Sequence, residues 1–303
     1  MTRKSIPLVV VLVAAAGLLV YFWRQPKAAT SVQGSATINV VAGENFWGDI
    51  VKQIGGSYVK VTSMITDPNA DPHLYESNAA NASAIATADV VIKNGLGYDD
   101  FMDRLLSVSP SAKRTVLSVG DMLQVSDHGA NPHLWYDIPK VPTVAATIES
   151  VLAVKDPAHA LVYSTNLATF DASLQPILNV MTKIKSDYPE APVAYTERVP
   201  GYLLADTGLT VKTPVGFASA IEDGNDPSPS DTLAFQNLIT SHSIKVLLYN
   251  AQAISAVTQH VRDLASQNNI PVVGVTETLP ANEPHYQSWQ LDQVTALLSA
   301  LSR

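Results

Sequence analysis

Two short segments of the sequence, DPHLYES at 71–77 and NPHLWYD at 131–137, closely resemble each other. Each places a histidine after a proline and follows it with a leucine, aromatic residues and a carboxylate. Imidazole is the commonest metal ligand in proteins, and the chain has only 7 histidines. A single histidine in such a turn is more often structural, but two in matched settings favour a shared ligand.

A divalent ion needs more ligands than two imidazoles, and this chain has no cysteine to supply thiolates. Two glutamates stand in matched positions, because Glu197 ends APVAYTE and Glu277 ends IPVVGVTE, each after a threonine. Both segments have the composition of buried strands, and α/β sheets bind ligands at the carboxyl ends of their strands. Either glutamate alone would usually be solvated. Together with His73 and His133 they are the candidate metal ligands.

Three further polar side chains lie near these histidines along the chain. Glu76 follows His73 by three residues, which favours a helix cap or a hydrogen-bond partner over a ligand. We expect Asp137 to be structural, and His128, in a short polar loop, either to be solvated or to assist metal capture.

The elements that must position these ligands alternate from Thr37 onward between apolar strands and helices, which predicts βα units and a mainly parallel sheet in each of two lobes. No strand pattern occurs from 142 to 185, where we predict a helix at 143–154 and a second one of about thirty residues that Pro176 bends or interrupts. Strands are expected within 37–43, 59–66, 88–95, 114–120, 191–197, 210–217, 243–250 and 270–277, and further helices within 44–56, 77–88, 230–241, 252–268 and 285–302.

These patterns divide the chain into five parts. We predict a signal peptide or N-terminal membrane anchor at 1–29, a tether at 30–36, an N-terminal α/β lobe at 37–141, a helical region at 142–187 and a C-terminal α/β lobe at 188–303. Both matched histidine segments fall in the first lobe, and both glutamates fall in the second.

The first part has the form of an export signal, since Arg3 and Lys4 precede an apolar run at 6–23. This run is long for a cleaved signal and just long enough to span a bilayer, so a removed signal and an uncleaved anchor both remain open. In either case the positive-inside rule predicts that the N-terminus stays in the cytoplasm. Everything after residue 30 is then exported to a periplasmic or extracytoplasmic location. The absence of cysteine excludes a lipid-modified cysteine and a cysteine nucleophile.

Composition narrows the class of protein further. The chain is 47% hydrophobic and 15% charged, which indicates a globular protein rather than a disordered one. Its net charge is −8, and no run of lysine or arginine follows the export segment. Nucleic acid is therefore not an expected partner, because binding a polyanion requires clustered cations.

Seven segments occur in an order that points to one family: VAGENFW at 41–47, DPHLYE, ADVVIKNGLGYDDFMDRLL at 88–106, NPHLWYD, DPAHALVYSTNLATF at 156–170 and the two Thr-Glu pairs. In this combination the chain resembles the zinc/manganese-type (cluster A-I) substrate-binding proteins of bacterial metal ABC importers over essentially all of 37–302. The resemblance implies two α/β lobes joined by a long rigid linker helix and opening only slightly.

The same resemblance implies a monomer that holds one metal ion between its lobes and delivers it to a permease with its ATPase. Carried over by position, His73 and His133 are the ligands from the first lobe, and Glu197 and Glu277 are the ligands from the second. These positions coincide with the candidates found from the residues themselves.

The donor set bears on which metal is carried. Zinc importers of this family commonly have histidine as the third ligand and a histidine-rich loop before the second motif, whereas this chain has Glu197 and only His128 there. Two imidazoles with two carboxylates form a harder set, which favours Mn²⁺ or Fe²⁺. We therefore expect manganese. Zinc is a close second, because Zn²⁺ binds most such sites more tightly than Mn²⁺.

Two other functions fit parts of the pattern. A metal-dependent hydrolase could use a His and carboxylate site to activate water, but it needs an open coordination position, and the sequence contains no HExxH or GxSxG motif. A metal-independent surface adhesin would be distinguished by the lack of stoichiometric metal.

Overall fold

The structure is a computed structural model that describes residues 37–67, 75–125 and 129–303. The chain separates into two units, 1–36 and 37–303, and all the elements described here belong to the second. The predicted ligand His73, the neighbouring candidate His128 and the apolar run at 6–23 lie outside the described residues. No helix in the described part is long and apolar enough to cross a membrane.

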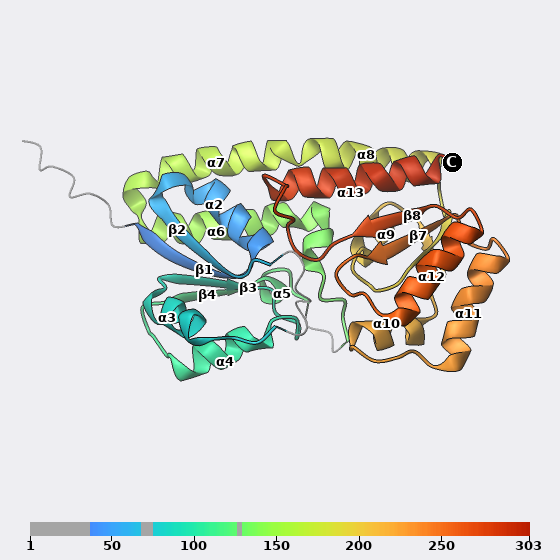
Figure 1. The fold of residues 1–303 in the computed structure, drawn as a ribbon. Helices are drawn as coiled ribbons and strands as arrows, with labels where there is room; N and C mark the ends of the chain where they lie inside the picture. The colour runs from blue at the N-terminus through green and yellow to red at the C-terminus, as the bar shows by residue number, and fades with distance from the viewer. Residues whose placement is uncertain (1–36, 68–74, 126–128) are drawn as a thin grey trace, which may run out of the picture. The chain divides into compact units, whose positions relative to one another are not determined.

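The first sheet contains four parallel strands in the order β2-β1-β3-β4, and all four were predicted (Figure 1). Val40 of the inner strand β1 is in register with Val61 of β2 on one side and Val90 of β3 on the other. The strands are β1 (Ile38–Glu44), β2 (Val59–Ile65), β3 (Val90–Lys93) and β4 (Thr115–Ser118).

Helices cover both faces of this sheet (Figure 1). Helix α2 (Asn45–Gly55) buries its apolar side, which includes Phe46 and Trp47, on one face. Helices α3 (Ala79–Thr87) and α4 (Asp100–Val108) pack on the other, where Val41 and Val91 belong to the same buried cluster as Ile85 and Phe101. The short helix α5 (Val119–Met122) follows β4. The sequence patterns did not predict α4 or α5.

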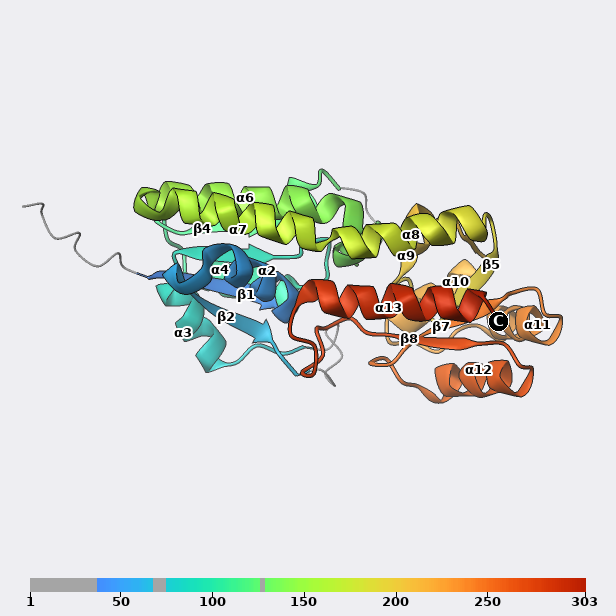
Figure 2. The same ribbon diagram turned by 90° about the horizontal axis from the view of Figure 1, so that it is seen from above.

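The middle of the chain is helical, as expected, but the predicted helix of about thirty residues is two helices. Leu174 separates α7 (Ala160–Ser173) from α8 (Gln175–Asp187), which run end to end in Figure 2. The break follows from Pro176, which has no N–H to continue the helical ladder and is tolerated only in a first turn. Helix α6 (Val141–Lys155) precedes them.

The second sheet is also parallel, in the order β6-β5-β7-β8. The prediction of a strand across 210–217 was largely wrong, because Pro214 cannot donate to a sheet ladder and instead caps a helix that begins at Val215. The strands are β5 (Pro192–Tyr195), β6 (Thr210–Val211), β7 (Val246–Asn250) and β8 (Val272–Val275).

Helices α10, α11 and α12 share a buried cluster with one face of the second sheet, and α8 and α13 lie side by side on the other (Figure 1). The expected fold class, two lobes that each have a parallel sheet flanked by helices, is confirmed. The bounds are α9 (Gly201–Asp206), α10 (Val215–Glu222), α11 (Pro229–Thr240), α12 (Ala256–Gln267) and α13 (Tyr286–Leu301), with 3-10 turns at Gly56–Tyr58, Leu134–Tyr136, Ile138–Lys140 and Pro157–His159.

The two lobes share one hydrophobic core. A single buried cluster includes side chains of β1, α2, α6, α7 and α8 and continues into β7, β8 and α13. Hydrogen bonds follow the same path: Asn45 Nδ2 donates to the Leu279 carbonyl at 2.8 Å, and Asp49 Oδ2 accepts the Tyr286 N–H at 2.8 Å. The carboxyl ends of both sheets are thereby held within one packed unit.

Candidate metal-binding site

His133 lies immediately before the 3-10 turn Leu134–Tyr136, and its side chain is fully buried. Its Nδ1 is 2.6 Å from Asn131 Oδ1. Asn131 presents that oxygen because its Nδ2 donates to the Arg198 carbonyl at 2.8 Å. In the neutral imidazole, Nδ1 therefore carries the proton and Nε2 carries the lone pair that a metal ion would need.

Hydrogen bonds join the loop that carries His133 to the segment that follows Glu197. Besides the Asn131 amide, Tyr202 Oη donates to the Asn131 carbonyl at 2.8 Å. Arg198 donates to the Gly129 carbonyl at 2.9 Å. It also forms a bidentate ion pair with the Glu222 carboxylate, with hydrogen bonds of 2.6 and 2.7 Å. This pairing raises the pKa of Arg198. The first-lobe loop therefore has a fixed position relative to the second-lobe ligands.

Glu277 follows β8 by two residues and is fully buried. Its Oε2 accepts a hydrogen bond from Tyr98 Oη at 3.0 Å and lies 3.5 Å from His133 Nε2, so it meets side chains of the first lobe. Its backbone N–H donates to Gln252 Oε1, which also accepts the Thr278 N–H at 3.0 Å. Hydrogen bonds therefore fix both the Glu277 carboxylate and the backbone that carries it.

Glu197 follows β5 by two residues, and its side chain is buried. Asn250, the last residue of β7, donates from Nδ2 both to Glu197 Oε2 and to Glu277 Oε1, the latter at 2.7 Å. The sequence patterns did not predict a role for Asn250 or Gln252. The available signal was the segment SIKVLLYN, whose polar last residue ends a buried strand at the same edge as the two glutamates.

The structure thus brings three of the four predicted ligands into one buried region at the carboxyl ends of β5, β7 and β8. His133 and Glu277 are close to each other, and Asn250 joins Glu277 to Glu197. Among the residues that the structure describes, no group of three or more His, Asp or Glu side chains is arranged to hold a metal ion. With His73 outside those residues, the four-ligand site stays a prediction.

The neighbouring polar residues have other roles. Glu76 is exposed, and Asn78 rather than Glu76 caps α3. Asp137 is buried and pairs with Lys140 at 2.8 Å, which agrees with the structural role predicted for it.

Two further carboxyl groups, Glu44 and Asp99, are buried in the first lobe, Glu44 at the carboxyl end of β1. Asp99 accepts the N–H groups of Asn94 and Gly95 at 2.7 and 2.8 Å, which stabilise its ionised form. Burial, and then the negative charge of Asp99, raise the pKa of Glu44 well above its usual range. Burial also raises the pKa of Asp99. Glu44 is therefore the carboxyl group of the pair that more readily retains its proton.

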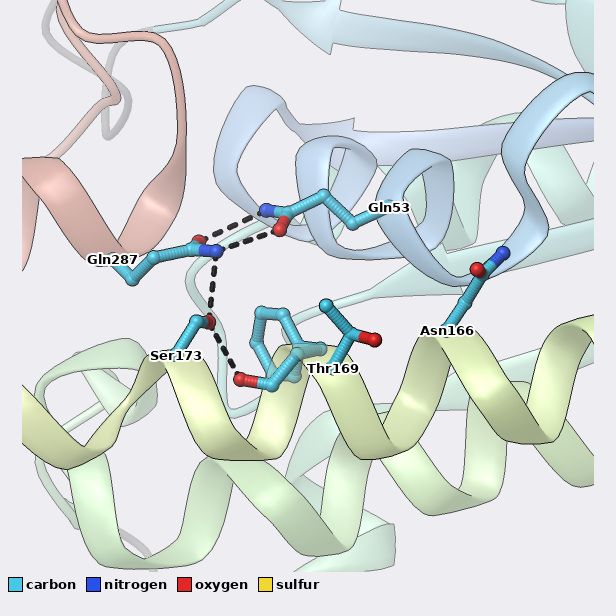
Figure 3. Close-up of a pocket in the computed structure, with 6 residues that line it drawn as sticks. Gln53, Asn166, Thr169, Ser173 and Gln287 are labelled. Carbon is cyan, nitrogen blue, oxygen red and sulfur yellow. Dashed lines mark hydrogen bonds between the residues drawn. The ribbon is translucent and has the colours of Figure 1, made fainter.

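The cavity in Figure 3 lies apart from these ligands. It has a volume of about 170 Å³, and no candidate ligand lines it. Three of its polar side chains hydrogen bond to one another: Gln287 reaches both Gln53 of α2 and Ser173 at the end of α7. This network contributes to the contact between the lobes.

Known proteins that are named for zinc or manganese are similar to this chain. The family model described as zinc-uptake complex component A, periplasmic, matches residues 40–300. The chain is 24% identical over 249 residues to the manganese-binding lipoprotein MntA of Bacillus subtilis, with 78% of each chain covered. It is 29% identical over 155 residues to MntA of Halalkalibacterium halodurans, which is 48% of this chain and only 49% of that relative. The structure of the periplasmic zinc binding protein TroA from Treponema pallidum matches with a TM-score of 0.76 and 18% identity, covering 88% of this chain and 100% of that one.

Proposed function

The chain belongs to the zinc-uptake complex component A family, and on this premise we propose that it captures one divalent transition metal ion at His73, His133, Glu197 and Glu277 and delivers it to an ABC permease. The family consists of metal-binding substrate-binding proteins of ABC transporters, which are not enzymes. The metal-dependent hydrolase considered from the sequence is accordingly set aside.

The observation that carries this proposal is the meeting of ligands from both lobes. Nε2 of His133 and Oε2 of Glu277 come within 3.5 Å of each other, although 144 positions separate them in the sequence. Both side chains are fully buried, and hydrogen bonds from neighbouring side chains fix their orientation. A cation bound between them would be stabilised by the carboxylate charge in a region from which water is largely excluded.

We propose Mn²⁺ as the favoured ion, with Zn²⁺ close behind and Fe²⁺ as a third candidate. Two carboxylates and two imidazoles form a hard donor set, which supports manganese. The relatives point both ways, since those from Bacillus subtilis and Halalkalibacterium halodurans are named for manganese and that from Treponema pallidum for zinc.

The proposed location is outside the cytoplasm, as the family description "periplasmic" supports. The two MntA relatives are named lipoproteins, whereas this sequence contains no cysteine for a lipid to modify. If the segment at 6–23 is not cleaved, it would supply the membrane attachment instead. The proposed partners are a permease with its ATPase.

Elemental analysis tests this function directly. The full chain, purified without chelator or metal-affinity resin, should contain close to one transition metal ion per molecule. Competition titration of the metal-free protein with Mn²⁺ and Zn²⁺ then gives the two affinities. A chain that binds neither ion with one-to-one stoichiometry would refute metal capture, and purified protein that contains Zn²⁺ and no Mn²⁺ would refute manganese as the favoured ion.

A further inference from the structure

The segment that carries Glu277 leaves the second sheet and contacts the first lobe. It begins at Thr276, directly after β8, and at Leu279 it meets helix α2. Asn45, the first residue of α2, binds the Leu279 backbone twice: its Nδ2 donates to the Leu279 carbonyl at 2.8 Å, and its Oδ1 accepts the Leu279 N–H at 2.9 Å. The Asn45 amide therefore pairs with Leu279 as a residue of a neighbouring strand would.

Other side chains of the first lobe hold the same segment. Tyr136 Oη donates to the Thr276 carbonyl at 2.8 Å, and Tyr98 Oη donates to Glu277 Oε2 at 3.0 Å. Together with the two bonds of Asn45, these contacts lie on both sides of Glu277 and on its carboxylate. Two hydrogen bonds to one residue restrain its backbone in orientation as well as in position. The segment is thus attached to the first lobe as well as to its own sheet.

These contacts bear on the distance between Glu277 and His133. Within the second lobe, Asn250 donates to Glu277 Oε1, and Gln252 Oε1 accepts the N–H groups of Glu277 and Thr278. Such bonds orient the carboxylate relative to its own sheet, whereas His133 belongs to the first lobe. The separation of 3.5 Å between Glu277 Oε2 and His133 Nε2 therefore depends on the contacts that cross between the lobes.

We propose that Asn45 is a positioning residue for metal binding, which holds Glu277 beside His133 through its pair of hydrogen bonds to Leu279. This inference rests on the proposed function, since Glu277 and His133 are two of the ligands proposed there. A ligand that is already held in place loses less conformational freedom when the ion binds, and the ion then binds more tightly. Asn45 is not itself proposed as a ligand, because both of its polar atoms are turned toward the Leu279 backbone.

The test replaces Asn45, which is half-buried and can be changed with less disturbance of the core than the buried Tyr98 and Tyr136. Asn45→Ala removes both hydrogen bonds. Asn45→Ser keeps a polar side chain at the start of α2, but one too short to reach both the N–H and the carbonyl of Leu279. Circular dichroism and thermal unfolding of the full chain establish that each variant is folded.

Gln287→Ala is the matched control. Gln287 is also a half-buried amide that hydrogen bonds across the lobes, to Gln53 of the same helix α2, but it lies on α13 rather than on the segment of Glu277. We expect both Asn45 variants to bind Mn²⁺ and Zn²⁺ about tenfold more weakly than the wild type in competition titrations. Gln287→Ala should bind both ions like the wild type, although it lowers stability.

A double-mutant cycle then tests whether Asn45 acts through Glu277. Asn45→Ala is combined with Glu277→Ala, and the metal affinities of the two single variants, the double variant and the wild type are compared. If Asn45 positions Glu277, its removal should change the affinity little in a protein that already lacks this carboxylate. A purely structural role would lower the affinity by the same factor in both backgrounds.

Unchanged affinity in the Asn45 variants, an equal loss in Gln287→Ala, or equal factors in the double-mutant cycle would each overturn the proposal. An unfolded Asn45→Ala leaves the decision to Asn45→Ser, and if neither variant folds, the proposal fails, because a positioning role requires that the fold persist without the pair. Failure of the proposed function looks different, since the wild-type protein would then bind neither ion with one-to-one stoichiometry.

Discussion

Gln53 of α2 and Gln287 of α13 exchange two hydrogen bonds, at 2.9 and 2.7 Å, although they lie 234 positions apart in the sequence (Figure 3). Gln287 also donates to Ser173 Oγ at 3.0 Å, where α7 ends. Gln53 donates in addition to Asp49, which in turn accepts the backbone N–H at the start of α13. The paired amides therefore join the first lobe, the last helix and the α7–α8 junction.

Loss of this pair should weaken the folded state. We expect Gln53→Ala and Gln287→Ala each to lower the free energy of unfolding by about 1 kcal/mol, because each leaves a half-buried amide without its partner. The double variant should lose less than the sum of the two, as measured by urea unfolding in a double-mutant cycle. Gln175→Ala, in an exposed pair with Asn179, is the control and should change stability little. Strict additivity at Gln53 and Gln287 would show that the amides do not act as a pair.

The predicted ligands should each be needed for metal capture. We expect His73→Ala, His133→Ala, Glu197→Ala and Glu277→Ala each to lower metal affinity by at least about tenfold, because each removes one of four donors. Isothermal titration with the preferred ion measures this. His260→Ala, an exposed histidine on α12, is the control and should bind like the wild type. A variant with unchanged affinity would remove that residue from the ligand set.

Asn131 should matter through His133. Asn131→Ala removes the acceptor that fixes the Nδ1 proton, and we expect it to weaken metal binding by about tenfold. Asn131→Asp keeps an acceptor oxygen of nearly the same shape and adds negative charge, so it should retain or increase affinity. The titrations are compared at one pH and after thermal unfolding has shown that both variants fold. Equal losses in the two variants would point to the lost Asn131–Arg198 contact rather than to His133.

The buried Glu44 should make stability depend on pH. Its folded-state pKa is raised by burial and by Asp99, above an unfolded value near 4.5. Above that unfolded value the unfolded chain releases the proton while the folded chain keeps it. The stability contributed by Glu44 is therefore fully present below about pH 4.5 and is lost as the pH rises toward the folded pKa.

Glu44→Gln removes this titration. In the absence of metal, the variant should have a larger free energy of unfolding than the wild type at pH 7, and this gain should be smaller at pH 4. The difference from wild type should grow with pH by no more than about 1.4 kcal/mol per unit, the limit for one proton. Urea unfolding across this range measures the effect, and Glu190→Gln, at an exposed position, is the control. Parallel stability curves for wild type and Glu44→Gln would show that Glu44 ionises normally in the folded protein.

Local sequence features predicted much of the fold. Apolar runs of strand length identified all eight strands of the described residues, although β6 proved much shorter than expected, and Pro176 predicted the interruption between α7 and α8. These features succeed because strand burial and the lack of a proline N–H act over a few neighbouring residues. Helix α4 was missed although Phe101, Met102 and Leu105 recur at helical spacing, because its nine residues are fewer than the roughly eleven over which this pattern is usually recognised.

The sequence by itself also determined which residues could bind a metal, since residue type and position after a strand are properties of a short segment. Only the tertiary structure decided how those segments meet. Strand order places β7 between β5 and β8, and so Asn250 between the two glutamates. The packed core brings His133 to Glu277 across the lobes. Such contacts join groups dozens to hundreds of positions apart and arise from packing of the whole chain, which no local pattern encodes.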